Sequence, residues 1–144
     1  LYEYDNMVLR KGNNDWDMPT QPQQNSSYAG MRQFRAFNEN CYLTAHAGET
    51  YDNIAREIGI SAHKLAKYNE RPEDAPLNEG EIVWLRKKQR HVPENFGKQY
   101  HTVRSNESLY DISQQYGVRL KNIMKANRKI VKRGIKAGDR VVLP

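Results

Sequence analysis

The chain contains two copies of one segment, and this repeat limits the possible folds more than any other feature. Residues 42–85 align without a gap to residues 100–143, at a shift of about 58 positions. The same residue recurs in many aligned pairs, among them Tyr42/Tyr100, Ile54/Ile112, Gly59/Gly117, Asn69/Asn127 and Gly80/Gly138. A register kept over this length indicates a tandem repeat. The sequence therefore predicts two small modules rather than one domain.

Each copy has about 45 residues, a size at which a buried core is only marginally sufficient. Cys41 is the single cysteine, so no disulfide can form within the chain. The four histidines show no ligand spacing typical of a structural metal. We therefore expect no metal and no cofactor, and we expect stability to come from efficient small cores or from packing against a neighbour.

The first half of each repeat predicts a strand followed by a helix. In the first copy a short strand, 42–45, leads to Thr50, whose hydroxyl suits a helix N-cap. Apolar residues follow at helical spacing up to Gly59, where a left-handed residue is favoured at a helix end. Ser108 and Gly117 occupy the same positions in the second copy. Both copies are expected to share this helix.

The second half of each repeat predicts another helix and a closing strand. Ser61 suits the N-cap of the second helix in the first copy, which should end near Asn69. A polar loop follows in both copies, before strands at 82–85 and 140–143. Two short strands separated by two helices should pair antiparallel with both helices on one face. The fold class is therefore α+β, with two βααβ modules that each have a two-stranded antiparallel sheet.

The segments outside the repeats predict a leader and a linker. Residues 1–30 are rich in Asn, Gln, Pro and Ser and predict a connector, in which Trp16 either packs on a module, as we favour, or forms a ligand platform. Residues 31–41 predict an extra strand and turn that form a hairpin with the start of the first module, 42–85. Because the chain begins at Leu1 rather than Met, we expect a fragment or a processed product.

Residues 86–99 predict a solvated linker to the second module, 100–144. Pro93 and Gly97 interrupt regular structure in this linker, and its many charged side chains favour contact with water. Residues 91–144 hold 11 basic and 4 acidic side chains, a net charge of +7, within a chain of +6. A solvated basic surface is the favoured interpretation, and an acidic partner is the alternative. No apolar run reaches membrane-spanning length, so we expect no membrane insertion.

The second copy contains the motifs Asn106-Glu107-Ser108-Leu109, Tyr116-Gly117-Val118, Ile123-x-x-x-Asn127 and Gly138-Asp139-x-Val141-x-Leu143-Pro144. With these residues it resembles a LysM module from end to end. The first copy resembles the family through Ala47-Gly48-Glu49-Thr50, Gly59-Ile60-Ser61 and Leu77-x-x-Gly80. The pair with its leader is similar to the C-terminal part of bacterial cell-wall glucosaminidases with tandem LysM modules.

The resemblance implies non-catalytic binding of a glycan that contains N-acetylglucosamine, with peptidoglycan favoured over a chitin-like polymer. In the family the ligand lies in a shallow groove between the loop before the first helix and the loop before the last strand. Transferred to this chain, the groove residues are Gly48, Glu49, Thr50 and Tyr51 with Asn69, Glu70, Arg71 and Pro72, and Asn106, Glu107, Ser108 and Leu109 with Arg128, Lys129 and Ile130. Asn106 stands where the family most often has Gly, and Asn tolerates left-handed backbone.

The implied role is to anchor an attached hydrolase, possessed by a longer parent protein, to the wall. The resemblance places the protein in the bacterial cell envelope, either periplasmic or at the cell surface, and we expect a monomer. The alternative function is an interaction module whose basic second repeat binds an acidic protein or polymer, with a degenerate sugar groove. Nucleic acid is not expected as a partner, because the basic run 125–136 has no aromatic residue on which bases could stack.

Four side chains have alternative interpretations. Glu49 and Glu107 resemble catalytic carboxylates, but glycoside hydrolysis needs two carboxylates across one cleft, and an acid favoured by the helix dipole is the simpler interpretation. Trp84 alternates with core positions, so it either stacks on sugar or, as we favour, is covered by the leader hairpin. Tyr51 lies beside the predicted groove, yet its helical position favours the core. We therefore expect no enzymatic activity from this fragment.

Overall fold

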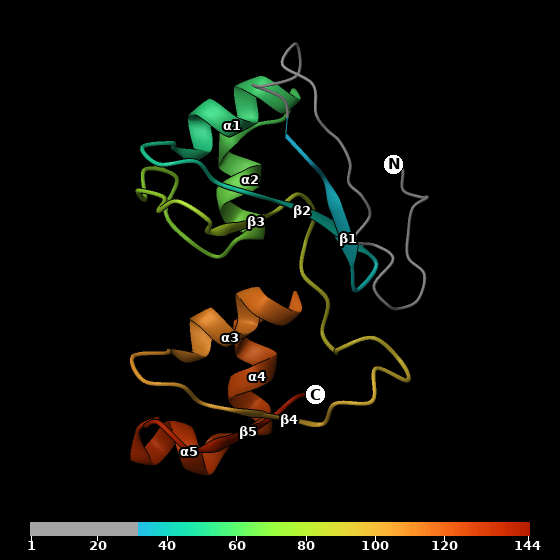
Figure 1. Cartoon of the computed structure of the whole chain (residues 1–144), viewed down its shortest axis with the longest axis vertical. Helices are drawn as coiled ribbons and strands as arrows, with labels where there is room; N and C mark the ends of the chain where they lie inside the picture. Colours follow the sequence, from blue (N-terminus) through green and yellow to red (C-terminus); the bar gives the residue numbers. More distant parts are fainter. Residues whose placement is uncertain (1–31) are drawn as a thin grey trace.

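The structure, a computed structural model, describes residues 32–144, so the predicted connector and Trp16 lie outside the described residues. The elements follow in the order β1 (Arg35–Phe37), β2 (Asn40–Thr44), α1 (Tyr51–Ile58), α2 (Ala62–Tyr68), β3 (Ile82–Trp84), β4 (Tyr100–Thr102), α3 (Leu109–Tyr116), α4 (Leu120–Ala126), α5 (Arg128–Arg133) and β5 (Arg140–Val142). Two bodies of the same topology stack along the long axis of the molecule (Figure 1). The predicted pair of βααβ modules is confirmed.

Each module has its own antiparallel sheet. Strand β2 pairs with β3, and β4 pairs with β5 in the equivalent register. Strand β1 adds a third strand to the first sheet, which has the order β1-β2-β3. The β1–β2 turn consists of Asn38 and Glu39, both with φ of 54°, as a tight two-residue hairpin turn requires. The predicted extra strand and hairpin are confirmed.

Local side chains fix the first helix of each module. Thr50 and Ser108 each accept a hydrogen bond from the backbone N–H three residues later, and the side chain at that later position bonds back. Gly59 and Gly117 end the helices in left-handed conformation, with φ of 81° and 64°. The predicted caps and the predicted glycine helix ends are confirmed in both copies.

Two separate hydrophobic cores lie between the sheets and their helices. The fully buried residues of the first core include Leu43, Tyr51, Ile54, Leu65 and Val83. Those of the second core include Ile112, Val118, Ile123 and Val141. Each such side chain contributes about 1.5–3 kcal/mol by leaving water. The favoured interpretation of Tyr51 as a core residue is confirmed.

The loop before the last strand differs between the modules. We predicted a polar loop in both, but in the second module this segment forms helix α5. The first module has Pro72 and Pro76 in the equivalent stretch, and proline breaks helical hydrogen bonding. The second module has no proline there and is rich in Lys and Arg, which favour helix. Arg128, Lys129 and Ile130 therefore lie on a helix rather than in a loop.

The linker predicted at 86–99 keeps most of its residues exposed, but part of it packs against the second module. The side chain of Lys88 is fully buried, and Gln89 forms a parallel bridge with Val118. Val92 and Phe96 pack against the second core. Lys88 is buried despite its charge because an acid and polar groups surround it. Lys88 has these partners in both modules.

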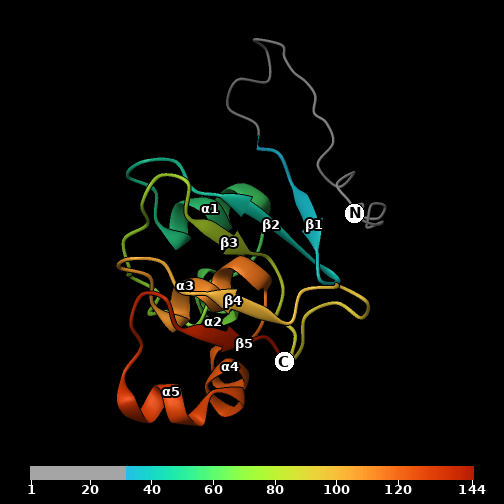
Figure 2. The same cartoon turned by 60° about the horizontal axis from the view of Figure 1, so that its bottom comes forward.

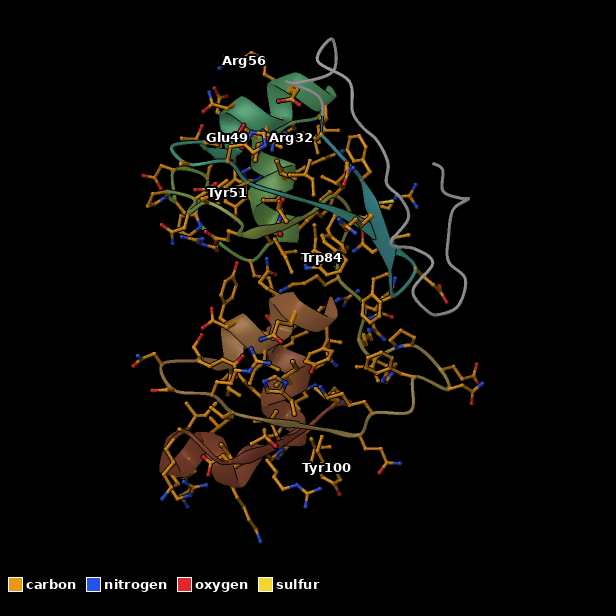
Figure 3. The ribbon with its side chains drawn as sticks, viewed as in Figure 1. Arg32, Glu49, Tyr51, Arg56, Trp84 and Tyr100 are labelled. Atoms are coloured by element: carbon orange, nitrogen blue, oxygen red, sulfur yellow. The ribbon has the colours of Figure 1, made fainter. Side chains whose placement is uncertain are left out.

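Trp84 lies between the two modules with 0% of its surface exposed (Figure 3). Its indole Nε1 donates to the carbonyl of Gln114 at 2.9 Å, and its ring contacts the backbone at Gly117 so closely that a Cβ there would lie 2.9 Å from it. The ring of Tyr42 lies 4.9 Å away on β2. The predicted burial is therefore correct, but the second module supplies much of the cover that we assigned to the leader hairpin.

Candidate functional site

The loops that form the predicted grooves lie on one side of the molecule. In the first module the loop before α1 contacts the loop before β3, because Thr50 and Pro76 form an antiparallel bridge. The corresponding parts of the second module, the β4–α3 loop and α5, lie on the same side in both views (Figures 1 and 2). The structure thus brings the predicted segment 48–51 against the loop that begins with the predicted segment 69–72, and places the corresponding loops of both modules on one side (Figures 1 and 2).

Glu49 is held in place by the residue that precedes the hairpin. Its carboxylate pairs with the guanidinium of Arg32, whose side chain is only 2% exposed (Figure 3). Arg32 also donates to the carbonyl of Thr44 at 2.9 Å and pairs with Glu57 at 3.1 Å. The other oxygen of Glu49 accepts from the backbone N–H of His46. Arg32 was missed from the sequence because it lies outside the repeat.

Glu107 occupies the same place in the second module with different side-chain partners. Its Oε1 lies 2.8 Å from Nε2 of His101 and accepts from the backbone N–H of Arg104 at 2.9 Å, while Gln115 donates to Oε2. Burial opposes ionisation, yet these hydrogen bonds hold the pKa of Glu107 below its usual value. His101 is fixed in turn by the hydroxyl of Tyr116, 2.7 Å from Nδ1. Both glutamates therefore act as structural acceptors that shape their loops.

Left-handed residues shape the same two loops. Gly48 has φ of 81°, and Asn106 at the equivalent position has φ of 64°. Asn106 thus takes the backbone conformation that we expected asparagine to tolerate in place of glycine. Gly48 and Asn106 are exposed, so the backbone of each loop borders solvent.

Asn69 and Asn127 use their side chains inside the fold. Nδ2 of Asn127 donates to the carbonyls of Ile123 and Val142, at 2.8 and 3.0 Å, and its Oδ1 accepts from the N–H of Val142 at 2.7 Å. Asn69 makes the same three kinds of bond to Leu65 and Trp84. Each asparagine therefore links the second helix to the last strand, and its side chain is not presented to a groove.

The remaining predicted groove residues differ in exposure. Leu109 and Ile130 are half-buried against the second core, and Tyr51 is fully buried. Arg71 pairs with Glu81 and donates to the carbonyl of Pro76 at 3.1 Å. The exposed members are Pro72, Glu70, Ser108, Arg128 and Lys129. Glu70 is nevertheless engaged, because its Oε1 lies 2.7 Å from Nζ of Lys88.

The groove loops offer hydrogen-bonding groups to a ligand. Across residues 32–144 no three His, Cys, Asp or Glu side chains gather in a way that could hold a metal ion. In the same range no helix has the length and apolarity needed to cross a membrane. Fixed loops with exposed backbone amides suit a ligand rich in hydroxyl and amide groups.

Comparisons with known proteins agree with the repeat. The family model for the LysM domain matches residues 44–86 and 101–144. Among solved structures, the chain is similar to the spore cortex-lytic enzyme SleL of Bacillus cereus, with 23% identity and a TM-score of 0.30. It is also similar to SleL of Bacillus megaterium, with 26% identity and a TM-score of 0.29. No curated protein matches significantly.

The chain spans only 22% of the length of each SleL structure, and each match covers 72% of the chain. The two family matches fall on the two βααβ modules, one match to each module. Together these matches include more than half of the chain. The chain therefore belongs to the LysM family, of which it carries two tandem modules.

Proposed function

We propose that the chain binds glycans containing N-acetylglucosamine, most readily peptidoglycan, and that it anchors an attached wall hydrolase in the bacterial cell envelope. LysM domains generally bind such glycans rather than cleave them. The observation that carries the proposal is the shared construction of the groove loops. Both modules place a left-handed residue, an engaged glutamate and a capped helix start at the same positions.

This construction favours binding because the loops are ordered before a ligand arrives. A loop that must be ordered on binding loses conformational entropy, and this loss weakens the complex. Glu49 and Glu107 each accept a backbone N–H from their own loop, so the loops have a defined shape without ligand. An N-acetyl group presents a donor, an acceptor and a methyl, which fixed backbone amides beside an apolar notch can recognise.

The tandem arrangement supports a polymeric ligand. Two modules on one chain raise the effective concentration of the second groove once the first is occupied. This gain needs a repeating ligand, which peptidoglycan and chitin both provide. The attached hydrolase, of the N-acetylglucosaminidase type, would then be retained near its substrate.

An NMR titration with N-acetylglucosamine oligomers of increasing length tests the proposal. We expect amide shifts at residues 48–51 with 69–72, or at residues 106–109 with 128–130. Glucose oligomers of the same length, which lack the N-acetyl group, should leave these amides unchanged. Absence of shifts with the longest soluble oligomer and with peptidoglycan fragments, while the fold is intact, would contradict the proposed function.

Helix α5 favours a second candidate function, binding of an anionic polymer or acidic protein. Arg128, Lys129 and Lys132 are exposed on this helix, and Lys125 is exposed just before it. Ion pairing between exposed groups is screened by salt, whereas sugar binding by fixed amides is not. Binding to an anionic polymer that disappears at high salt, together with no response to N-acetylglucosamine oligomers, would favour this candidate.

A further inference from the structure

A cleft of about 750 Å³ opens between the two modules. The first module lines it with Arg71 and the turn 78–82 that leads into β3. The second module lines it with Tyr110, Asp111 and Gln115 from the first two turns of α3. This cleft shares Glu70 and Arg71 with the predicted groove of the first module, but its other lining residues belong to neither predicted groove.

The cleft has a fixed shape because contacts hold the modules together at its base. The hydroxyl of Tyr110 donates to the carbonyl of Asn69 at 2.7 Å. Buried Lys88 pairs with Glu70 of the first module and donates to Gln114 of the second module at 2.7 Å. With Trp84 packed beside these bonds, the two walls keep one relative orientation.

The cleft adjoins the predicted groove of each module. Arg71 belongs both to the cleft and to the predicted groove of the first module. On the other wall, Gln115 donates to Glu107, which shapes the groove loop of the second module. Tyr110 directly follows the groove residue Leu109. The three surfaces therefore follow one another in the order groove, cleft, groove. All groove loops lie on one side of the molecule (Figures 1 and 2).

The polar groups of the cleft suit a neutral saccharide. Two of its carboxylates have cationic partners within the protein, Glu81 with Arg71 and Glu70 with Lys88. A third, Asp111, accepts the N–H of Ser108 at the start of α3. The exposed side chains of Asn78, Glu79 and Gln115 offer donors and acceptors for hydroxyl and amide groups. The acidic lining would repel a polyanion, which separates this surface from the basic helix α5.

We propose that a single glycan chain crosses both modules and that the inter-module cleft binds the sugar units between the two grooves. This inference rests on the proposed function and adds a third subsite to it. Because the interface between the modules is rigid, the distance between the two grooves is constant. The grooves and the subsite between them therefore match one length of glycan.

The test compares short and long N-acetylglucosamine oligomers on the full chain and on a cleft variant. The short oligomer fills one groove, and the long one spans both. The double variant Asn78→Ala with Glu79→Ala removes two exposed side chains from the cleft and leaves both grooves intact. Glu94→Ala is the matched control, because Glu94 is exposed on the linker outside the cleft. Isothermal titration calorimetry gives the affinities, and circular dichroism confirms folding.

We expect the double variant to bind the long oligomer about tenfold more weakly, as two lost hydrogen bonds imply. Its affinity for the short oligomer, and both affinities of Glu94→Ala, should remain those of the original chain. In NMR spectra, amides of residues 78–82 and 110–115 should shift with the long oligomer and not with the short one.

Two results would overturn the inference while the proposed function stands. One is that long oligomers bind the original chain no more tightly than short ones, which means that the grooves act separately. The other is that the double variant and the original chain bind long oligomers equally. If no oligomer of any length binds, the proposed function and this inference both fail.

Discussion

The two modules hold the same groove carboxylate by different means. Glu107 is fixed by His101, a residue of its own repeat, whereas Glu49 is fixed by Arg32, which lies before the repeat begins. The carboxylate and a backbone N–H donor three residues earlier are common to both copies, but the side-chain donor is not. The first module therefore depends on a residue of the leader, while the second contains its own support.

The outer faces of the two sheets differ even more. In the first module Trp84 is fully buried beneath the second module. In the second module the equivalent Val142 is 38% exposed, and Tyr100 at the other strand is 43% exposed (Figure 3). The same face of one fold is thus an interface in one copy and solvent-accessible surface in the other. The positions at which the two copies differ in sequence determine whether this face forms an interface or stays accessible to solvent.

The largest expected effect separates the two faces directly. We predict that Trp84→Ala lowers the free energy of unfolding by about 3–5 kcal/mol, because it leaves a cavity between the modules. Val142→Ala should cost less than about 1 kcal/mol, because the side chain is already partly in water. Urea unfolding followed by tryptophan-independent circular dichroism measures both. Equal losses would mean that the modules do not pack on Trp84 in solution.

The next effect concerns the buried lysine at the interface. Glu70→Ala should cost about 2–3 kcal/mol at neutral pH, because the buried ammonium of Lys88 loses its only anionic partner among the described residues. Burial holds the pKa of Lys88 below its usual value, and Glu70 opposes this shift. Glu73→Ala, which removes a glutamate that is more than half exposed, is the control and should change stability little.

The lowered pKa of Lys88 also predicts how the effect of Glu70→Ala changes with pH. A lysine with a lowered folded-state pKa binds fewer protons when folded than when unfolded, so stability rises with pH between the two pKa values. Removal of Glu70 lowers the folded-state pKa further. The stability difference between Glu70→Ala and the original chain should therefore shrink as pH rises toward 10. A difference that stays constant over the alkaline range would show that Lys88 is not the cause.

A smaller effect compares two glycines at equivalent positions. Gly59→Ala should cost about 1 kcal/mol, the strain of a left-handed alanine, because nothing lies within 4 Å of the added Cβ. Gly117→Ala should cost about 1–2 kcal/mol more, because its Cβ would lie 2.9 Å from the ring of Trp84. In a double-mutant cycle, Trp84→Ala should remove this excess. An unchanged excess would place its origin elsewhere than at the tryptophan.

Local chemistry explains why so much of each module could be predicted. The side chain of Thr50 favours the start of a helix, and the backbone of Gly59 favours its end. The alignment of the two copies therefore predicted both ends of α1. The strands followed from apolar alternation, and the hairpin followed from the Asn-rich turn. None of these inferences depends on what packs against the outer face of the sheet.

The contacts between modules depend on non-local packing, which periodicity does not encode. The burial of Lys88 and the cover over Trp84 arise only when the second module is placed against the first. One clue was present, because the repeat diverges where the modules meet. Tyr110 stands where the first copy has Asp52, and Gln114 where it has Arg56. An aromatic side chain on an otherwise polar helix face indicated a contact.

The candidate site shows a different limit. Asn69 and Asn127 recur in both copies, and identity between copies is equally consistent with a ligand contact and with a structural link. The structure finds the side chains of both in hydrogen bonds between helix and strand. Glu49 and Glu107 have the same ambiguity, and their partners Arg32 and Gln115 lie at positions that no alignment of the two copies relates. The sequence predicted which loops form the grooves, but it could not show which atoms of these loops remain available to a ligand.

The smallest expected effect concerns the support of the second groove loop in acid. Hydrogen bonds hold the pKa of Glu107 below its usual value, so the folded state binds fewer protons there than the unfolded state. This contribution to stability is present above the unfolded-state pKa and is lost as pH falls through the folded-state pKa. Glu107→Gln keeps an acceptor oxygen but does not titrate, and should cost about 1 kcal/mol at neutral pH.

The change of stability in acid then shows whether the loop needs the charge of Glu107 or only its hydrogen-bond acceptors. Thermal unfolding measured from pH 7 downward should show the original chain approaching the stability of Glu107→Gln as the carboxylate becomes protonated. Glycan binding by the second module, followed through amides of residues 106–109, should weaken over the same range if the loop needs the carboxylate. If the difference in stability between the two proteins instead stays constant down to strongly acidic pH, the ionised form of Glu107 does not shape the loop. The comparison of Glu107 with Glu49 and its partner Arg32 would then rest on geometry alone.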